Sequence, residues 1–435
     1  MNNILSILSR LGIEQLNAMQ QDAMLAYRKS KAMVLLSPTG SGKTLAYLLP
    51  MFETIKEEGV LQAIIIVPSR ELAIQTVNVI KDSGTSVRAV AVYGGRPAMD
   101  EHRTLCGVHP HVIVGTPGRL LDHLRKGNIQ PDTLHTLIID EFDKCLELGF
   151  RDEMSQVFSA LPNNVKRVLL SATENTEITN FLPEYTRLDY LDHNAQSERI
   201  EQYVVKSPQK DKLETLSHFL HTLGQEQTIV FVGFRESVER VAKFLHQHGF
   251  YVSSLHGGME QRDREKELYR FVSGCTNILV STDIASRGLD IQDLDNVVHY
   301  HLPLNEQAFI HRNGRTARWD NVGRSFLLIG PDEDVPEYVG ITNDFYILDN
   351  SPIVIQPPKW ETLYIGKGKK DKLSKGDIAG FLMKVGGFER DEVGRIDVRD
   401  HYSYVAVSRD RLPNALPYLK EQKIKGMKTI IERIR

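Results

Sequence analysis

The sequence predicts an α/β fold in which two parallel-sheet domains follow one another and a small α+β domain ends the chain. Three observations support this prediction. The chain has 435 residues, which exceeds what one hydrophobic core usually supports. Short apolar runs alternate with longer helical patterns, and this alternation starts afresh once along the chain. A segment with three prolines, SPIVIQPPKW (351–360), then separates a last stretch of different composition.

The first set of expected strands consists of continuous apolar runs that are bounded by turn residues. Such runs are typical of strands buried on both faces of a parallel sheet. Helical patterns lie between them, for example GKTLAYLLPMFETIKEE (42–58) and RELAIQTVNVIKDSG (70–84). The expected strands are 32–37, 63–69, 87–93, 111–117, 136–141 and 167–173.

The second set follows the polar segment DHNAQSERIEQ (192–202). Its expected strands are 227–234, 251–257, 276–283, 297–303 and 324–330. We therefore predict a first domain over 1–200, a second over 201–350 and a third over 360–435.

The composition is that of an ordinary globular protein, with 41% hydrophobic and 25% charged residues. No apolar run approaches the length of about 18 residues that a membrane span needs, and the start, MNNILSILSR, lacks the features of a secretory signal. Cys106, Cys145 and Cys275 are widely separated, so we expect small buried side chains in a reducing compartment. The expected location is cytoplasmic, without membrane contact.

Charge is distributed unevenly along the chain. From Lys359 onward there are 18 Lys and Arg against 11 Asp and Glu, a net charge of +7. The net charge of the whole chain is −3, so the preceding 358 residues carry −10. A basic tail on an acidic body indicates a polyanionic partner for the tail, and the alternative is a solvated lysine-rich surface.

The segment SPTGSGKT (37–44) lies between a predicted strand and a predicted helix. Gly40 and Gly42 let the loop curl so that its N–H groups face phosphate oxygens. Lys43 supplies a positive charge to the outer phosphates, and Thr44 supplies a hydroxyl for Mg²⁺. The alternative is a simple glycine-rich turn. We expect the loop residues Thr39, Gly40, Ser41, Gly42, Lys43 and Thr44 to bind a nucleotide.

Two adjacent carboxylates follow another buried strand in LIIDEFDKC (137–145). In a phosphate-loop enzyme a neighbouring strand ends in an acid that holds the metal, and Asp140 fits this role. Glu141 is placed to orient and activate the attacking water. The alternative, a strand that ends in a polar turn, loses weight because the phosphate loop is present.

With these segments, residues 1–345 resemble the DEAD-box RNA helicases of superfamily two. The resemblance rests on ordered motifs: GIEQLNAMQ (12–20), SPTGSGKT (37–44), PSRELAIQ (68–75), Gly94-Gly95, TPGR (116–119), DEFD (140–143), SAT (171–173), IVFVGF (229–234), STDIASRGLD (281–290) and HRNGRTAR (311–318). It implies two RecA-like domains, ATP and Mg²⁺ as cofactors, and RNA-stimulated ATP hydrolysis. It also implies that Gln20 contacts the adenine, that Asp290 lies at the nucleotide, and that Arg315 and Arg318 act as arginine fingers.

The second domain lacks a Gly-Lys-Thr phosphate loop of its own. It offers Arg312, Arg315 and Arg318 at three-residue spacing, which we expect to lie along one face of a helical turn. A surface stripe of arginines is the alternative. We predict that ATP binds in a cleft between the two domains and that hydrolysis depends on closure of this cleft.

The sequence departs from the family pattern at two places. Phe142 stands where the family has alanine, and the aromatic residue expected upstream of the first motif is missing. We expect Phe142 to add volume near Ser171-Ala172-Thr173, with hydrolysis retained.

RNA binding by the two larger domains is expected to use backbone amides, helix starts and arginines along a sugar–phosphate track. The resemblance adds Gly94-Gly95 and the pair Gln261 and Arg264 to this set. The expected contacts are Arg70, Gly94, Gly95, Thr116, Gly118, Arg119, Gln261, Arg264 and Thr282.

The last residues resemble the carboxy-terminal domain of DbpA-type bacterial helicases, which is similar in fold to the RNA recognition motif. TLYIGKG (362–368) and DHYSYVAV (400–407) correspond to its first and third strands, with Tyr402 and Tyr404 at stacking positions. These tyrosines could equally pack the fold. The resemblance implies contacts with 23S-type ribosomal RNA. The expected contacts are Tyr402, Lys367, Lys369 and Lys370, with Lys425 on the last strand beside Lys423 and Lys428.

The predicted function is therefore an ATP-dependent RNA helicase that acts on large-subunit ribosomal RNA during ribosome assembly. The alternatives are a general RNA-remodelling helicase in mRNA metabolism or the cold response, an ATP-dependent RNA clamp, and a DNA-directed helicase. We expect a monomer, with a dimer as the alternative.

Overall fold

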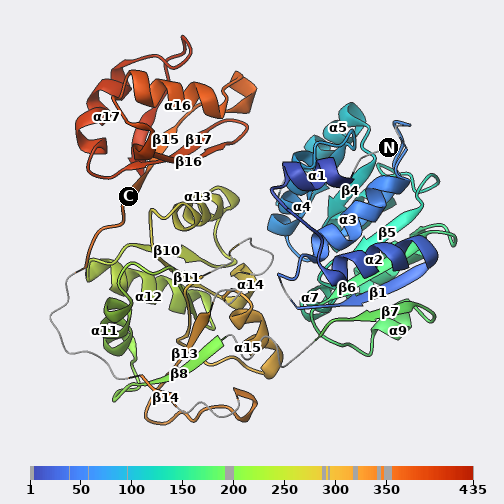
Figure 1. Cartoon of the computed structure of the whole chain (residues 1–435), viewed down its shortest axis with the longest axis horizontal. Helices are drawn as coiled ribbons and strands as arrows, with labels where there is room; N and C mark the ends of the chain where they lie inside the picture. The colour runs from blue at the N-terminus through green and yellow to red at the C-terminus, as the bar shows by residue number, and fades with distance from the viewer. Residues whose placement is uncertain are drawn as a thin grey trace. The chain divides into compact units, whose positions relative to one another are not determined.

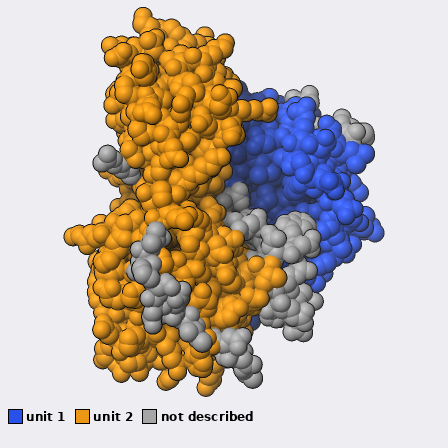
Figure 2. Space-filling model, turned by 60° about the vertical axis from the view of Figure 1, so that its left-hand side comes forward, with its two compact units in different colours: residues 1–196, 287–290 blue, residues 197–286, 291–435 orange. Residues whose placement is uncertain are grey.

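The computed structural model describes residues 4–38, 40–56, 58–95, 97–191, 200–286, 291, 294–316, 322–339, 344–346 and 355–434. The chain divides into two compact units, which Figure 2 shows in blue and orange. Unit 1 comprises residues 1–196 with 287–290, and unit 2 comprises residues 197–286 with 291–435. Each unit is described by itself.

Unit 1 contains a parallel sheet of seven strands in the order β3-β4-β2-β5-β6-β1-β7. All side chains of β2, β4 and β5 are buried, which explains their continuous apolar sequences. The strands are β1 (Ala32–Leu36), β2 (Ala63–Ile66), β3 (Ala89–Val92), β4 (Val112–Gly115), β5 (Thr136–Ile139), β6 (Lys166–Ser171) and β7 (Thr186–Asp189).

Helices cover both faces of this sheet (Figure 1). The first hydrophobic core lies under α1 (Ile4–Arg10), α2 (Ala18–Lys29), α3 (Lys43–Thr54) and α4 (Arg70–Asp82). The second core lies on the other face, under α5 (Ala98–Val108), α6 (Pro117–Arg125), α7 (Phe142–Glu147), α8 (Arg151–Ala160) and α9 (Ile178–Phe181).

Unit 2 begins with a second seven-stranded parallel sheet in the order β10-β11-β9-β12-β13-β8-β14. Its strands are β8 (Ile200–Lys206), β9 (Thr228–Phe231), β10 (Val252–Leu255), β11 (Ile278–Ser281), β12 (Asn296–His299), β13 (Gly323–Ile329) and β14 (Asp344–Phe345). Its helices are α11 (Leu213–Leu223), α12 (Arg235–Gln247), α13 (Gln261–Val272), α14 (Asp283–Ser286) and α15 (Glu306–Asn313). We call the two parallel-sheet domains lobe one and lobe two.

A third, smaller domain completes unit 2. Its four antiparallel strands, β16 (Val393–Val398), β17 (Ser403–Ser408), β15 (Trp360–Ile365) and β18 (Ile431–Ile434), lie side by side in that order. Helices α16 (Lys375–Lys384) and α17 (Leu412–Glu421) contribute to its hydrophobic core. The predicted class, two RecA-like domains followed by a small α+β domain, is confirmed.

The structure differs from the sequence predictions at several places. The strands β7, β8 and β14 were not predicted, because none of them has a continuous apolar run. β7 and β14 are edge strands, and β8 has only two consecutive buried residues. Helix α15 ends at Asn313, so Arg315 lies beyond it and the expected helical arginine face is wrong. Lys423, Lys425 and Lys428 precede β18 and do not lie on it.

The predicted burial of the cysteines is confirmed for two of the three residues. Cys145 and Cys275 are buried, whereas Cys106 is exposed. On α5 the neighbouring Leu105 occupies the buried face, and Cys106 is turned toward solvent. In the part of the chain that the structure describes, no helix combines the length and apolar character that crossing a membrane requires.

Candidate functional site

The predicted site residues of lobe one gather at the carboxyl edge of its sheet. Parallel strands all end at the same edge, so strand order decides which loops become neighbours. Loops after β5, β6 and β1 are adjacent and carry Asp140-Glu141, Ser171-Ala172-Thr173 and the phosphate loop. Loops after β3, β4 and β2 form the other half and carry Gly94-Gly95, Thr116 and Ser69-Arg70. The residues predicted to bind the nucleotide therefore lie in the first half of the edge, and those predicted to bind RNA lie in the second half.

The phosphate loop joins β1 to the amino end of α3. Gly40 and Gly42 have φ angles of 82° and 88°, in the region that favours glycine. The Lys43 ammonium is buried and donates to the carbonyl oxygens of Ser37 at 2.5 Å and Pro38 at 2.8 Å. The Lys43 charge therefore lies within the curl of the loop, where the helix amino end adds positive potential.

The start of α2 is hydrogen-bonded to this loop. Asn17 and Gln20 form a capping box, and Asn17 Nδ2 donates to the Ser41 carbonyl at 3.0 Å. Gln20 Nε2 donates to the Gly42 carbonyl at 3.2 Å, and a Cβ on Gly42 would lie 2.4 Å from that nitrogen. Asn17 was not predicted, although the pattern Asn-x-x-Gln is a signal for a capping box.

Asp140 follows β5 and is 3% exposed. Its carboxylate accepts hydrogen bonds from the Tyr47 hydroxyl at 3.1 Å and from the Glu141 N–H at 2.9 Å. Burial raises the pKa of Asp140, and the nearby Lys43 ammonium opposes this effect. A buried carboxylate with so much desolvation is suited to binding a cation.

Glu141 has a φ angle of 50° and precedes α7. A left-handed conformation is uncommon for a residue other than glycine and is enriched at functional sites. Two residues on, Asp143 is buried and accepts a hydrogen bond from Thr173 Oγ1 at 3.0 Å. This bond joins the DEFD segment to the SAT segment after β6.

Phe142 is fully buried in the second core of lobe one. Its ring makes an edge contact with Phe181 of α9, with 5.3 Å between ring centroids. The volume that the Phe142 ring adds is therefore accommodated in the core beside α9. This helix begins five residues after Thr173.

In the other half of the edge, Arg70 begins α4 and lies against Gly95. A Cβ on Gly95 would come within 2.5 Å of the Arg70 guanidinium, and Gly95 has a φ angle of 92°. Among the residues that the structure describes, a Cβ on Gly94 or Gly118 would meet no atom within 4 Å apart from its chain neighbours. The chain itself therefore does not require glycine at these two positions, which are open to the approach of a ligand backbone.

Arg119 is held by a buried acid that was not predicted. Glu101 of α5 lies 3.2 Å from Arg119 Nε, 2.9 Å from His123 Nε2 and 2.9 Å from the N–H of Tyr93. Tyr93 directly precedes Gly94, so Glu101 joins the glycine pair to α6. A single acid on a surface helix carries no sequence signal for this role.

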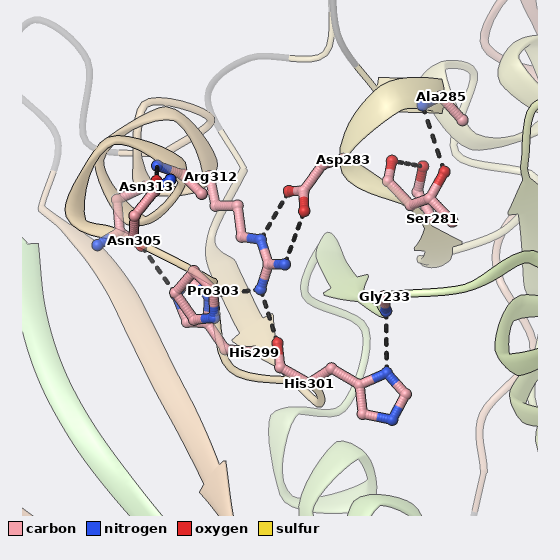
Figure 3. A network of polar contacts seen from close by, with 12 residues as sticks. Gly233, Ser281, Asp283, Ala285, His299, His301, Pro303, Asn305, Arg312 and Asn313 are labelled. Carbon is pink, nitrogen blue, oxygen red and sulfur yellow. Dashed lines mark hydrogen bonds and ion pairs between the residues drawn. The ribbon is translucent and has the colours of Figure 1, made fainter. Parts of the chain in front are cut away.

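Lobe two carries a buried ionic network at the equivalent edge (Figure 3). Arg312 is 3% exposed and binds both carboxylate oxygens of Asp283, at 2.7 and 2.8 Å. Its guanidinium also donates to the His301 carbonyl at 2.7 Å and lies over the Phe231 ring. This network links the segment after β11 to α15.

His299 lies under this arginine and is fully buried. Arg312 approaches Nδ1 at 3.3 Å, and Nε2 lies 3.1 Å from Asn313 Oδ1. Since a guanidinium only donates, Nδ1 accepts and Nε2 carries the proton. Burial lowers the pKa of His299 to about 3, and the Arg312 charge acts in the same direction.

Two of the other predicted residues of lobe two, Thr282 and Arg264, contact the segment that carries Asp283. Thr282 accepts from the Ala285 N–H at 3.3 Å, and Arg264 donates to the Ala285 carbonyl at 3.4 Å. Gln261 begins α13, and Arg315 is 9% exposed after α15. Thr39, Asp290 and Arg318 lie outside the described residues.

In the third domain, the structure brings two lysine-bearing segments together. Lys425 Nζ donates to the Lys372 carbonyl at 2.8 Å, and Lys370 Nζ lies 3.2 Å from His401 Nε2. Lys367 pairs with Asp371, and Lys369 is exposed. Tyr402 lies against α13 of lobe two, so stacking on a base would require the domain to leave that helix.

Three family models match the chain. Residues 17–181 match the DEAD/DEAH box helicase model, and residues 211–320 match the helicase conserved C-terminal domain. Residues 362–433 match the DbpA RNA binding domain. These ranges fall on lobe one, lobe two and the third domain.

Two relatives are similar to nearly the whole chain. The ATP-dependent RNA helicase DbpA of Bacillus subtilis is 30% identical, covering 98% of this chain and 96% of that protein. DbpA of Escherichia coli is 33% identical, covering 97% of this chain and 95% of that protein.

Solved structures are similar to the two larger domains. Dbp5 of S. cerevisiae, bound to RNA and ADP BeF3, has a TM-score of 0.70 at 26% identity, covering 79% of this chain and 92% of that one. Mss116p, bound to ssRNA and AMP-PNP, has a TM-score of 0.68 at 26% identity, covering 76% of this chain and 72% of that one.

Proposed function

We propose that this chain, which belongs to the DEAD-box ATP-dependent RNA helicases of the DbpA type, directs its activity to structured large-subunit ribosomal RNA. Family membership makes it an RNA helicase that hydrolyses ATP. The observation that supports the target is its third domain, a basic domain that matches the DbpA RNA binding domain over 362–433. We place this activity in the cytoplasm.

For the nucleotide, we assign the half of the lobe-one edge formed by β5, β6 and β1. The Thr39–Thr44 backbone would surround the phosphates, and the Lys43 ammonium would move from loop carbonyls to phosphate oxygens. Gln20 would contact the adenine. Its amide can do so while it stays bonded to Gly42, because the nitrogen has a second proton and the oxygen a second lone pair.

A magnesium ion fits the donor set of this half. The described residues contain no group of three or more His, Cys, Asp or Glu that could hold a metal. Asp140 and the Thr44 hydroxyl would therefore hold Mg²⁺ together with phosphate oxygens and water, the usual arrangement for this ion. The ion would neutralise charge on the phosphates, and Glu141 would orient and activate the attacking water.

Lobe two would complete the nucleotide site with Asp290 and the arginines Arg315 and Arg318. Arginines supplied by a second lobe stabilise transition-state charge only when the lobes close. Arg312 would have a supporting role, because its guanidinium is already occupied by Asp283 and His301.

For the RNA backbone, we assign the other half of the lobe-one edge and three residues of lobe two. Arginines, backbone amides and open glycines suit a sugar–phosphate track that is not read by sequence. The assigned residues are Arg70, Gly94, Gly95, Thr116, Gly118, Arg119, Gln261, Arg264 and Thr282.

In the third domain, we assign Lys367, Lys369, Lys370 and Lys425 to phosphates of the ribosomal RNA target. We propose that the chain acts as a monomer.

The proposed RNA target is tested by steady-state ATPase activity against RNA concentration, with a large-subunit rRNA fragment, a poly-RNA and a DNA as activators.

The variant Lys369→Gln/Lys370→Gln should raise the half-saturating concentration of the rRNA fragment and lower its salt slope by about two, one for each phosphate contact. The matched control is Lys384→Gln/Lys420→Gln, at exposed helix ends of the same domain. Equal activation by all RNAs, unchanged by the first variant, would instead indicate a general RNA-remodelling helicase. Equal activation by DNA would remove the RNA preference.

A further inference from the structure

The half of the lobe-one edge that we assign to RNA has a counterpart in lobe two. Strands β2 and β9 are each third in the strand order of their sheet. The loop after β2 ends in Ser69-Arg70, and the loop after β9 ends in Phe234-Arg235. In both lobes the arginine is the first residue of the following helix, α4 or α12. The two loops therefore hold the same place in the two sheets.

The two arginines also make the same contact. Each lies against the second glycine of a Gly-Gly pair, and this pair follows the first strand in the order, β3 or β10. A Cβ on Gly95 would come within 2.5 Å of the Arg70 guanidinium. A Cβ on Gly258 would come within 2.4 Å of the Arg235 guanidinium. The loops that carry the proposed RNA track of lobe one thus recur in lobe two.

The residue before the arginine differs between the lobes. Ser69 is the N-cap of α4, and its hydroxyl accepts a hydrogen bond from the Leu72 N–H at 3.2 Å. Phe234 is the N-cap of α12, and a phenyl ring cannot accept such a bond. Phe234 is also 69% exposed. The chain gives up a polar helix cap here and places a large apolar ring in solvent, a departure from local preference that is typical of functional positions.

The Phe234 ring is supported from a neighbouring loop. Strand β12 pairs with β9, and the loop after β12 carries His301. The Gly233 N–H donates to His301 Nδ1 at 2.9 Å, as Figure 3 shows, and this bond fixes the backbone just before Phe234. The rings of Phe234 and His301 make an edge contact, with 6.3 Å between their centroids. The ring therefore has a defined partner while most of its surface stays accessible.

The other neighbour of β9 is β11, which is followed by Thr282. Thr282 and Arg264, which we assign to the RNA track, both contact Ala285 in this segment. Strand order thus places Phe234 between the His301 loop and a segment of the proposed track. An aromatic ring beside an RNA backbone is suited to stacking on a base, because every base offers a π face.

We infer that Phe234 stacks on a base of the RNA strand that binds lobe two. The contact adds one base to a track that otherwise binds sugar and phosphate. Since all bases have aromatic faces, it contributes affinity with little sequence preference. The inference rests on the proposed RNA contacts of lobe two, because these bring the strand to this edge.

The stacking is tested on the full chain by fluorescence anisotropy, with a non-hydrolysable ATP analogue present. One labelled strand is an oligo-U of about ten nucleotides, and the other has the same sugar–phosphate backbone without bases. We expect Phe234→Ala to weaken binding of oligo-U at least about fivefold and binding of the abasic strand by less than about twofold. The difference between the two effects measures the coupling between the ring and the bases.

Further substitutions separate the aromatic face from apolar bulk. Phe234→Tyr keeps the face and should bind oligo-U within about twofold of the unaltered chain, whereas Phe234→Leu should lose as much affinity as Phe234→Ala. Phe345→Ala is the matched control and should leave binding unchanged. Phe345 is 61% exposed on β14, the strand at one edge of the same sheet.

Two results would overturn the stacking. Phe234→Ala could bind oligo-U as tightly as the unaltered chain does, or it could lose the same factor for both strands, which would place the ring against the backbone. Arg264→Gln tests the proposed track separately and should weaken both strands by a similar factor, because a phosphate contact does not involve the bases. If Arg264→Gln changes neither, the proposed contact of Arg264 is wrong, and the comparison of the two strands still decides the stacking.

Discussion

The two lobes have the same strand order, yet only one of them carries a phosphate loop. Strand β8 occupies in lobe two the place of β1 in lobe one. Both strands lead into Ser-Pro, and the serine N–H binds the neighbouring strand in each case, Ser37 to Ser171 at 3.0 Å and Ser207 to Ile329 at 2.7 Å. The chain then continues as TGSGKT in lobe one and as QKDKLE in lobe two.

The difference lies in two glycines. Lys43 and Lys212 each stand at the start of the following helix, but Lys43 donates to two carbonyls within a curled loop. Lys212 donates to Leu328 at 2.9 Å and to Glu333 at 2.7 Å, and no glycine lies between Ser207 and Lys212. Topology thus gives both lobes a loop at this position, and Gly40 and Gly42 allow the loop of lobe one to curl so that its N–H groups can face a phosphate.

The largest expected effect separates these two lysines. Lys43→Met should reduce the rate of ATP hydrolysis by about 100-fold or more, because it removes positive charge from the phosphates. Lys212→Met should leave the rate within about twofold, since the Lys212 ammonium is bound to a carboxylate and a carbonyl of its own lobe. RNA-stimulated ATPase assays on both variants check this. A large loss in Lys212→Met would show that hydrolysis depends on Lys212 as well.

Glu141→Gln sharpens the comparison within lobe one. It keeps the shape of the side chain and removes the base, so hydrolysis should fall by about 100-fold or more while ATP and RNA binding persist. Fluorescent-nucleotide binding and ATPase rates are measured on the same sample. Asp152→Asn, at the start of α8, is the control for loss of one acid. Normal turnover by Glu141→Gln would show that another group activates the water.

At the carboxyl edge of the lobe-two sheet, Arg312 joins neighbouring segments through its bonds to Asp283 and to the His301 carbonyl. Arg312→Lys cannot keep both bonds to Asp283, so we expect the free energy of unfolding to fall by about 2 kcal/mol or more. The control, Arg240→Lys, alters an exposed pair with Asp211 and should change it by less than about 0.5 kcal/mol. Urea unfolding followed by circular dichroism distinguishes them, and equal values would show that the network is not a stabilising feature.

The smallest expected effect is a pH dependence of stability. The pKa of His299 is about 3 in the folded protein and about 6.5 when unfolded. Below pH 6.5 only the unfolded state takes up this proton, so stability should fall as pH is lowered from 6.5 toward 3, by at most about 1.4 kcal/mol per pH unit from this group. Melting temperatures between pH 6.5 and 5 test this, because most carboxylates titrate lower. His299→Gln should flatten the slope, and an unchanged slope would exclude His299 as its source.

Much of the fold was predictable because both sheets are buried on two faces. Their central strands are continuous apolar runs, and the phosphate loop and the DEFD segment are each short local motifs that directly follow such a run. Edge strands such as β7, with the sequence TRLD, carry no comparable pattern. The end of α15 at Asn313 was also missed, because three-residue spacing of arginines is compatible with a turn as well as a helix.

The unpredicted parts of the site depend on contacts between distant segments. Glu101 acts on Arg119 and Tyr93 only after α5 and α6 have packed beside one another. Likewise, the aromatic pattern of β15 and β17 predicted a surface for RNA, and nothing in the sequence indicates that α13 covers it. A local sequence pattern can identify which side chains are able to bind a ligand. It cannot show which of them are instead bound to other parts of the folded chain.

Gly94 and Gly118 have a consequence of a different kind. Among the described residues, the methyl group of an alanine at either position would meet no atom within 4 Å apart from its chain neighbours, so we expect it to have little effect on the folded protein alone. Any effect of that methyl on function would measure how closely another molecule's backbone passes. Alanine variants at these two positions therefore report how closely the proposed RNA backbone passes each of them.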